Sequence, residues 1–198
     1  MTPIFEDKLD TVLVIDDEPF NTEWLTEYFK ARGYNVVEAV DLETALAALE
    51  KTRYRYVVID LSIPVSPALA QPLASLGTEF FRYPGLMVAR RARTTGHNTF
   101  QVIVYSVHES ADVDAYADLI VCRYILKGRP SELKNHIEST MHRKPTGWIS
   151  TKSVKMLPKV RRPPRKVVAK KKPPAKKPIV KKKSFSARYP SLALGKKK

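Results

Sequence analysis

The chain has 198 residues and a formal net charge of +15, and that charge is unevenly distributed. Residues 143–198 contain 21 of the 35 lysines and arginines and no acidic residue, whereas residues 1–142 contain all 20 acidic residues and carry a net charge of −6. This distribution excludes a uniformly basic protein and predicts an acidic globular domain at residues 10–142 followed by a disordered basic tail at residues 143–198.

Other features of the sequence narrow the class of protein further. The single cysteine, Cys122, excludes an intramolecular disulfide. No apolar run approaches the roughly 18 residues that a membrane-spanning helix needs, and the N-terminal segment lacks the basic start and apolar stretch of a signal peptide. We therefore expect a cytoplasmic protein, and association with the nucleoid stays open.

Short apolar runs alternate with helical patterns along the first 142 residues. Strands are predicted at residues 12–15, 35–40, 54–59, 100–105 and 123–126. Helices are predicted at 19–32, from the N-cap Asp41 onward, at 79–93 with an interruption at 84–85, at 110–119 and at 130–141. Residues 61–77 contain three scattered prolines and are predicted to form a loop. Five successive strand–helix units predict an α/β domain, a parallel sheet with helices on both faces.

Polar residues follow four of these strands directly. Asp16 and Asp17 follow the first, Asp60 the third, Ser106 the fourth and Lys127 the fifth. In open α/β sheets the carboxyl ends of the strands are where ligands bind, and three carboxylates brought together there favour a hard cation such as Mg²⁺. Asp60 is then a candidate nucleophile for a phosphoryl group, with the Ser106 hydroxyl and the Lys127 ammonium group as partners for the phosphoryl oxygens.

The segments around these residues resemble the receiver domains of two-component response regulators, a CheY-like family. The likeness covers residues 10–142 and is carried by Val12-Leu-Val-Ile-Asp-Asp-Glu18, Val57-Val-Ile-Asp-Leu-Ser-Ile-Pro64, Val102-Ile-Val-Tyr-Ser106 and Tyr124-Ile-Leu-Lys127. It implies a flavodoxin-like, doubly wound five-stranded parallel sheet with strand order 2-1-3-4-5.

The resemblance also assigns roles to single residues. It implies that Asp60 is the phosphoacceptor and that Asp16, Asp17, Asp60 and the backbone carbonyl of Ser62 bind Mg²⁺. It implies further that Ser106 is the switch hydroxyl, that Tyr124 is the aromatic residue that moves with it, and that Lys127 pairs with the phosphate. The phosphodonor is then a sensor histidine kinase or a phosphotransfer protein, and the chain is not an independent enzyme.

Three departures from the family pattern lie near the site. The stretch between Asp60 and Ser106 is about sixteen residues longer than is usual, and the extra length lies at 65–76 and around 83–85, where it either gates phosphodonors, docks a partner or is a tolerated surface insertion. Gly128 replaces the usual proline after Lys127, which disfavours a cis peptide bond there. Val107 replaces a small residue after the switch serine, which leads to the hypothesis of slow dephosphorylation.

The basic tail is a low-complexity segment rich in lysine, proline and alanine. Prolines and like charges favour an extended chain, and the composition is similar to that of linker-histone tails. We expect non-specific, salt-dependent binding to DNA or RNA; polyphosphate, an anionic membrane surface and the acidic domain itself are alternative partners. The candidate nucleic-acid contacts are Lys159, Arg161, Arg162, Arg165, Lys166, Lys170, Lys171, Lys172, Lys176, Lys177, Lys181, Lys182 and Lys183.

Two functions stay open on the sequence alone. The first is a response regulator of phosphorelay signalling with a nucleic-acid-binding tail, and the second is a receiver-like architectural or scaffold protein that binds a polyanion without acting as a switch. The four histidines, His97, His108, His136 and His142, show no metal-ligand spacing, and we interpret them as surface residues. The sequence does not indicate an oligomeric state.

Overall fold

The structure, a computed structural model, describes residues 5–109 and 111–145. The predicted tail therefore lies, from residue 146 onward, outside the described residues, and so do all thirteen candidate nucleic-acid contacts. Within the described ranges, no helix is both long enough and apolar enough to cross a bilayer.

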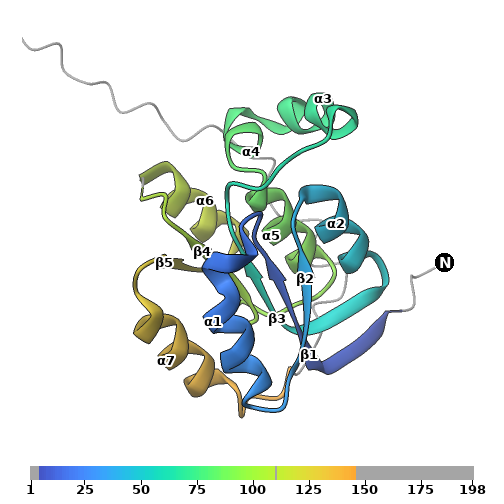
Figure 1. Cartoon of the computed structure of the whole chain (residues 1–198). Helices are drawn as coiled ribbons and strands as arrows, with labels where there is room; N and C mark the ends of the chain where they lie inside the picture. The colour runs from blue at the N-terminus through green and yellow to red at the C-terminus, as the bar shows by residue number, and fades with distance from the viewer. Residues whose placement is uncertain (1–4, 110, 146–198) are drawn as a thin grey trace, which may run out of the picture. The chain divides into compact units, whose positions relative to one another are not determined.

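Five parallel strands form one sheet in the order β2-β1-β3-β4-β5, which confirms the predicted flavodoxin-like topology (Figure 1). The strands are β1 (Glu6–Ile15), β2 (Asn35–Ala39), β3 (Thr52–Ile59), β4 (Val102–Ser106) and β5 (Arg123–Leu126). Because β1 and β3 are neighbours at the centre of the sheet, the residues that follow them emerge side by side.

Helices cover both faces of this sheet (Figure 1). Helices α1 (Pro19–Lys30) and α7 (Pro130–Thr140) pack on one face, and α2 (Leu42–Lys51), α5 (Gly85–Thr94) and α6 (Ala111–Ile120) pack on the other. Side chains along β1 alternate between the two hydrophobic layers, since Val12 and Val14 join the first cluster and Leu13 and Ile15 the second. This burial on both faces explains why the central strands are continuously apolar in sequence.

Strand β1 is longer than its apolar segment. It was predicted to begin at residue 12, and it begins at Glu6, where Glu6 to Lys8 pair with Thr52 to Tyr54 of β3 before a shift in register. The residues of this extension are exposed and mostly charged. Backbone pairing therefore forms a strand where the hydrophobic pattern gives no signal.

The prediction of a loop at residues 61–77 is wrong, because residues 67–76 form helix α3 (Pro67–Leu76). Proline was taken as a breaker, but Pro67 occupies the first turn, where a missing N–H costs nothing. Pro72 lies inside the helix and removes one hydrogen bond, while Leu73 is buried in the core. The predicted interruption at 84–85 is confirmed, since it separates α4 (Thr78–Arg82) from α5.

Candidate phosphoacceptor site

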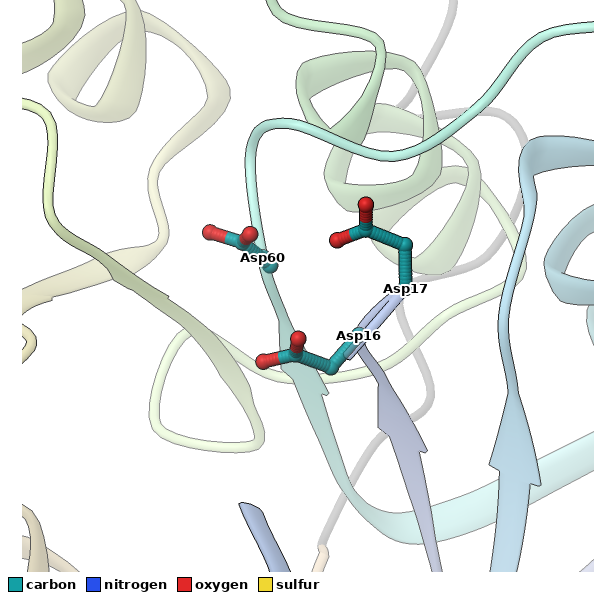
Figure 2. Close-up of side chains that lie close together, drawn as sticks. All are labelled: Asp16, Asp17 and Asp60. Atoms are coloured by element: carbon teal, nitrogen blue, oxygen red, sulfur yellow. The ribbon is translucent and has the colours of Figure 1, made fainter. Parts of the chain in front are cut away.

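Three carboxyl groups meet where β1 and β3 end. The Asp60 N–H donates to the Ile15 carbonyl over 2.8 Å, which holds the end of β3 against the end of β1. One oxygen from each of Asp16, Asp17 and Asp60 lies within 4.8 Å of the others. Figure 2 shows the three carboxyl groups arranged around one space. An oxygen-rich cluster of this kind suits a hard divalent cation.

The three acids differ in their surroundings. Asp16 and Asp60 are buried, whereas Asp17 is exposed. Asp16 accepts a hydrogen bond from the Glu18 N–H over 3.1 Å, and Asp60 Oδ1 accepts one from the Leu61 N–H over 2.8 Å. Burial raises the pKa of Asp16, and the Asp60 charge adds to this, although Lys127 opposes both effects.

Lys127, at the end of β5, places its ammonium group between two of these acids. Its Nζ lies 2.7 Å from Asp16 Oδ2 and 3.3 Å from Asp60 Oδ2, and the side chain is 12% exposed. Burial on its own lowers the pKa of Lys127, but the Asp16 hydrogen bond and the charges of Asp60 and Asp16 outweigh it and raise the pKa. The lysine therefore stays charged beside the candidate nucleophile.

A cavity of about 580 Å³ opens above this cluster. Its lining residues are Asp16, Asp17, Glu18, Asn21, Trp24, Asp60, Ser62, Tyr105, Val107, Lys127, Gly128 and Pro130. No residue of the extra segments 65–76 and 83–85 belongs to the lining, so gating of phosphodonors by these segments gains no support. Val107 is 64% exposed at this cavity, and Gly128 takes a φ of +93° after Lys127 through a trans peptide bond.

The two proposed switch residues lie outside the lining. Ser106 is fully buried, and its hydroxyl has no hydrogen-bond partner among the described residues. A buried hydroxyl without a partner is unusual, because its loss of solvation is uncompensated. Tyr124 is partly buried, and its hydroxyl donates to the backbone carbonyl of His108, two residues beyond Ser106. Burial raises the pKa of Tyr124, and the charges of Asp114 and Glu109 raise it further.

Gly85 packs against the loop after β3, which carries Asp60. The sequence analysis treated this glycine only as part of the insertion. Its N–H donates to the Leu61 carbonyl over 3.1 Å. A Cβ atom built on it would lie 2.1 Å from the backbone oxygen of Asp60, so only glycine fits. The sequence analysis did not predict this close approach, because the contact joins residues that are 25 positions apart in the chain.

Comparison with known proteins supports the resemblance that the strand-end motifs carry. Residues 12–67 match the response regulator receiver domain family. A curated relative, the probable transcriptional regulatory protein TcrX of Mycobacterium tuberculosis, is 39% identical over 54 residues. That match covers 27% of this chain and 23% of the relative, so the chain spans about a quarter of the relative's length.

Solved structures extend the likeness in fold beyond residue 67. A CheY-like receiver domain protein from Methanospirillum hungatei has a TM-score of 0.51 and 17% identity, covering 66% of this chain and 92% of its own. A two-component response regulator from Clostridium difficile has a TM-score of 0.52 and 13% identity, covering 67% and 96% respectively. At these identities the likeness shows the fold alone. The sequence match and the fold together confirm the resemblance to receiver domains.

Proposed function

From this receiver-type sequence and fold, we propose that the protein is a response regulator of two-component signalling that accepts a phosphoryl group on Asp60. The observation that carries the proposal is the cluster of Asp16, Asp17 and Asp60, with Lys127 Nζ in contact with two of the three acids. A carboxylate beside a retained positive charge is suited to attack on phosphorus.

The proposed step is a phosphoryl transfer from a phosphohistidine of a sensor histidine kinase or phosphotransfer protein. A carboxylate oxygen of Asp60 forms the new bond to phosphorus while the donor's P–N bond breaks, and the donor imidazole takes up a proton. Lys127 holds a positive charge next to Asp60 Oδ2, where it can pair with the incoming phosphoryl oxygens.

The residues present fit a Mg²⁺ ion. Asp16, Asp17, Asp60 and the backbone carbonyl of Ser62 would hold it, and bound there it would neutralise charge on the phosphoryl group. The Ser62 carbonyl oxygen accepts no hydrogen bond within the described residues, which leaves it available as a ligand. Burial raises the pKa of Asp16 and the charge of Asp60 adds to it, and a bound cation would favour the charged form of this acid.

The switch in this proposal consists of Ser106, Tyr124 and the loop after β4. Among the residues that the structure describes, the Ser106 hydroxyl has no hydrogen-bond partner to release, and the hydrogen bond from Tyr124 to the His108 carbonyl ties the ring to that loop. A movement of Ser106 toward the phosphoryl group would therefore disturb Tyr124, on the face formed by α6 and β5.

We also propose that the basic tail binds nucleic acid without sequence preference. Support comes from composition: the tail carries 21 basic residues and no acidic residue. Such a segment neutralises phosphates and releases counterions, and it suits a protein that works in the cytoplasm near DNA or RNA.

The test is phosphorylation by acetyl phosphate with Mg²⁺, read by intact mass. Wild-type protein should gain one phosphoryl group, which hydroxylamine removes, and Asp60→Asn should gain none. Asp41→Asn is the matched control, because Asp41 caps α2 through a bond of 2.8 Å to the Thr44 N–H, and asparagine caps equally well.

If the wild-type protein gains no phosphoryl group from acetyl phosphate or from a phosphohistidine donor, the proposal that it is a phosphorylation switch is contradicted. The second function, a scaffold protein that binds polyanions, would then account for the molecule. The position of Ser106 outside the cavity lining is the observation that favours this second function.

A further inference from the structure

In the loop after β3, the Ser62 side chain contacts a residue of another loop. Leu61 and Ile63 are buried in the core, and Ser62 between them is exposed and lines the cavity. The Ser62 hydroxyl lies 2.6 Å from Nε2 of His108. A hydrogen bond between the loop after β3 and the loop after β4 therefore holds Ser62, the residue whose backbone carbonyl would bind Mg²⁺ in the proposed function.

His108 is itself held on its other side. Its ring lies against the ring of Tyr83, with 5.2 Å between the ring centroids and 57° between the planes. Tyr83 is 5% exposed and joins α4 to α5, where its N–H donates to the Glu79 carbonyl over 2.8 Å. The backbone carbonyl of His108 also accepts the hydrogen bond from Tyr124. His108 therefore contacts Ser62 through Nε2, Tyr83 through its ring and Tyr124 through its backbone carbonyl.

The inserted segment provides this support although it does not line the cavity. Tyr83 packs on His108, and two residues later Gly85 contacts the backbone of Asp60 and Leu61. Two residues near the end of the insertion therefore position the segment 60–62. Gly85 contacts its backbone directly, and Tyr83 acts on Ser62 through His108.

We propose that His108 is a positioning residue that, held by Tyr83, orients Ser62 so that its backbone carbonyl binds a divalent cation together with the three acids. The inference rests on the proposed function, because it assumes that the acid cluster binds Mg²⁺. Partners that orient metal ligands are worth about tenfold or more in metal affinity. His108 acts through Ser62 and does not itself touch the metal.

The experiment is a Mg²⁺ titration of the full chain, followed by the fluorescence of Trp24, which lines the cavity. The chain contains two tryptophans, Trp24 and Trp148, so all variants carry Trp148→Phe. We expect His108→Ala and Ser62→Ala each to weaken Mg²⁺ binding about tenfold. The double variant should also be about tenfold weaker, because both changes break the same link.

Three further variants separate positioning from a merely structural role. His108→Gln keeps a group that can bond the Ser62 hydroxyl and should recover most of the affinity. Tyr83→Phe keeps the ring contact and should bind like wild type. His142→Ala removes an exposed histidine that does not line the cavity, and it should also bind like wild type. Circular dichroism without metal checks that every variant is folded.

The outcomes distinguish this inference from the proposed function. If wild type binds Mg²⁺ and His108→Ala binds it equally well, or if the two single losses multiply in the double variant, the role of His108 is overturned and the response-regulator proposal stands. If the wild-type chain fails to bind Mg²⁺ at all, the proposed function is overturned, and the role of His108 with it.

Discussion

His97 has no exposed surface, although the sequence analysis interpreted it as a surface residue, and that interpretation is wrong. Its Nε2 lies 3.0 Å from the Tyr54 N–H, which can only donate, so Nε2 is unprotonated. The proton therefore sits on Nδ1, which lies 3.0 Å from the Ala92 carbonyl. Burial lowers the pKa of His97 to about 4. A lone histidine gives no sequence signal of such burial, because the partner of Nε2, the Tyr54 N–H, is a backbone group 43 residues away in the chain.

This buried histidine predicts a pH dependence of stability. In the unfolded chain His97 takes up its proton near pH 6.5, but in the folded protein only near pH 4. Between these values the unfolded state binds more protons, so stability is fully present above about pH 6.5 and falls as the pH drops toward 4. The expected loss is on the order of 3 kcal/mol. Urea unfolding from about pH 7 to about pH 4 measures it.

The matched variant for this prediction is His97→Gln. It should be less stable than wild type near neutral pH but lose less stability on acidification. Asp41 and His136, whose pKa values are also lowered in the fold, titrate in both proteins and cancel in the comparison. If the free energy of unfolding falls equally steeply with pH in the two proteins, a role for His97 is contradicted.

Val107 gives a second prediction for a single residue. Val107 is 64% exposed and lines the cavity that contains Asp60, so we predict that its side chain restricts the approach of water to a phosphoryl group on Asp60. Val107→Ala should shorten the lifetime of the aspartyl phosphate several-fold, measured by loss of the phosphoryl group from the protein over time. Val37→Ala, a change on β2 at a residue outside the lining, should leave the lifetime unchanged. An unchanged lifetime in Val107→Ala removes the hypothesis.

Elements with a strong hydrophobic period were predicted from sequence, and those formed by long-range contacts were not. The run at residues 12–15 and the capping Asp41 mark their elements locally. Helix α3 was not predicted, because its leucines give too weak a helical pattern on their own. Leu73 is buried in the core and Leu69 packs against it, and these are contacts with distant segments that the local sequence does not show. The site was predicted from the positions of four residues, because parallel topology brings the strand ends together at one edge of the sheet. These residues are Asp16, Asp17, Asp60 and Lys127. The supports from His108, in the loop after β4, and from Gly85, at the start of α5, come from separate segments, and no spacing rule connects them to the site.

Helix α4, which lies between the two extra segments, is a structural part of the domain, and its two neighbouring phenylalanines test this. Phe80 is fully buried, with its ring 5.8 Å from that of Tyr116 on α6, whereas Phe81 is 56% exposed. Phe80→Ala should lower the free energy of unfolding by about 3–5 kcal/mol. Phe81→Ala should change it by about 0.5 kcal/mol or less. Urea unfolding of both variants provides the measurement, and similar values would show that α4 is not part of the core.

At the scale of the whole molecule, two regions of opposite charge share one chain. If the basic tail binds nucleic acid, the full chain should bind random-sequence DNA with a steep salt dependence, a log–log slope of about −0.9 for each phosphate neutralised. A protein ending at residue 145 should lose this binding while remaining folded, as judged by circular dichroism. Fluorescence anisotropy over a salt series measures both. DNA binding that survives the truncation would assign it to the acidic domain.

The same titration, repeated with beryllofluoride and Mg²⁺ on wild type and Asp60→Asn, asks whether the two regions communicate. A change in DNA affinity confined to wild type would mean that the acceptor site controls the tail. Equal affinities would mean that the two regions act independently.

The bridging position of Lys127 has a consequence for the order of events during synthesis. Asp16 and Asp60 leave the ribosome well before Lys127, so the two central strands can pair while their acids still lack a protein cation. Until β5 docks, those carboxylates repel each other, and a free divalent ion is the available counter-charge. Physiological magnesium should therefore speed refolding of the domain from denaturant, with the lysine taking over as neutralising group once the last strand is in place.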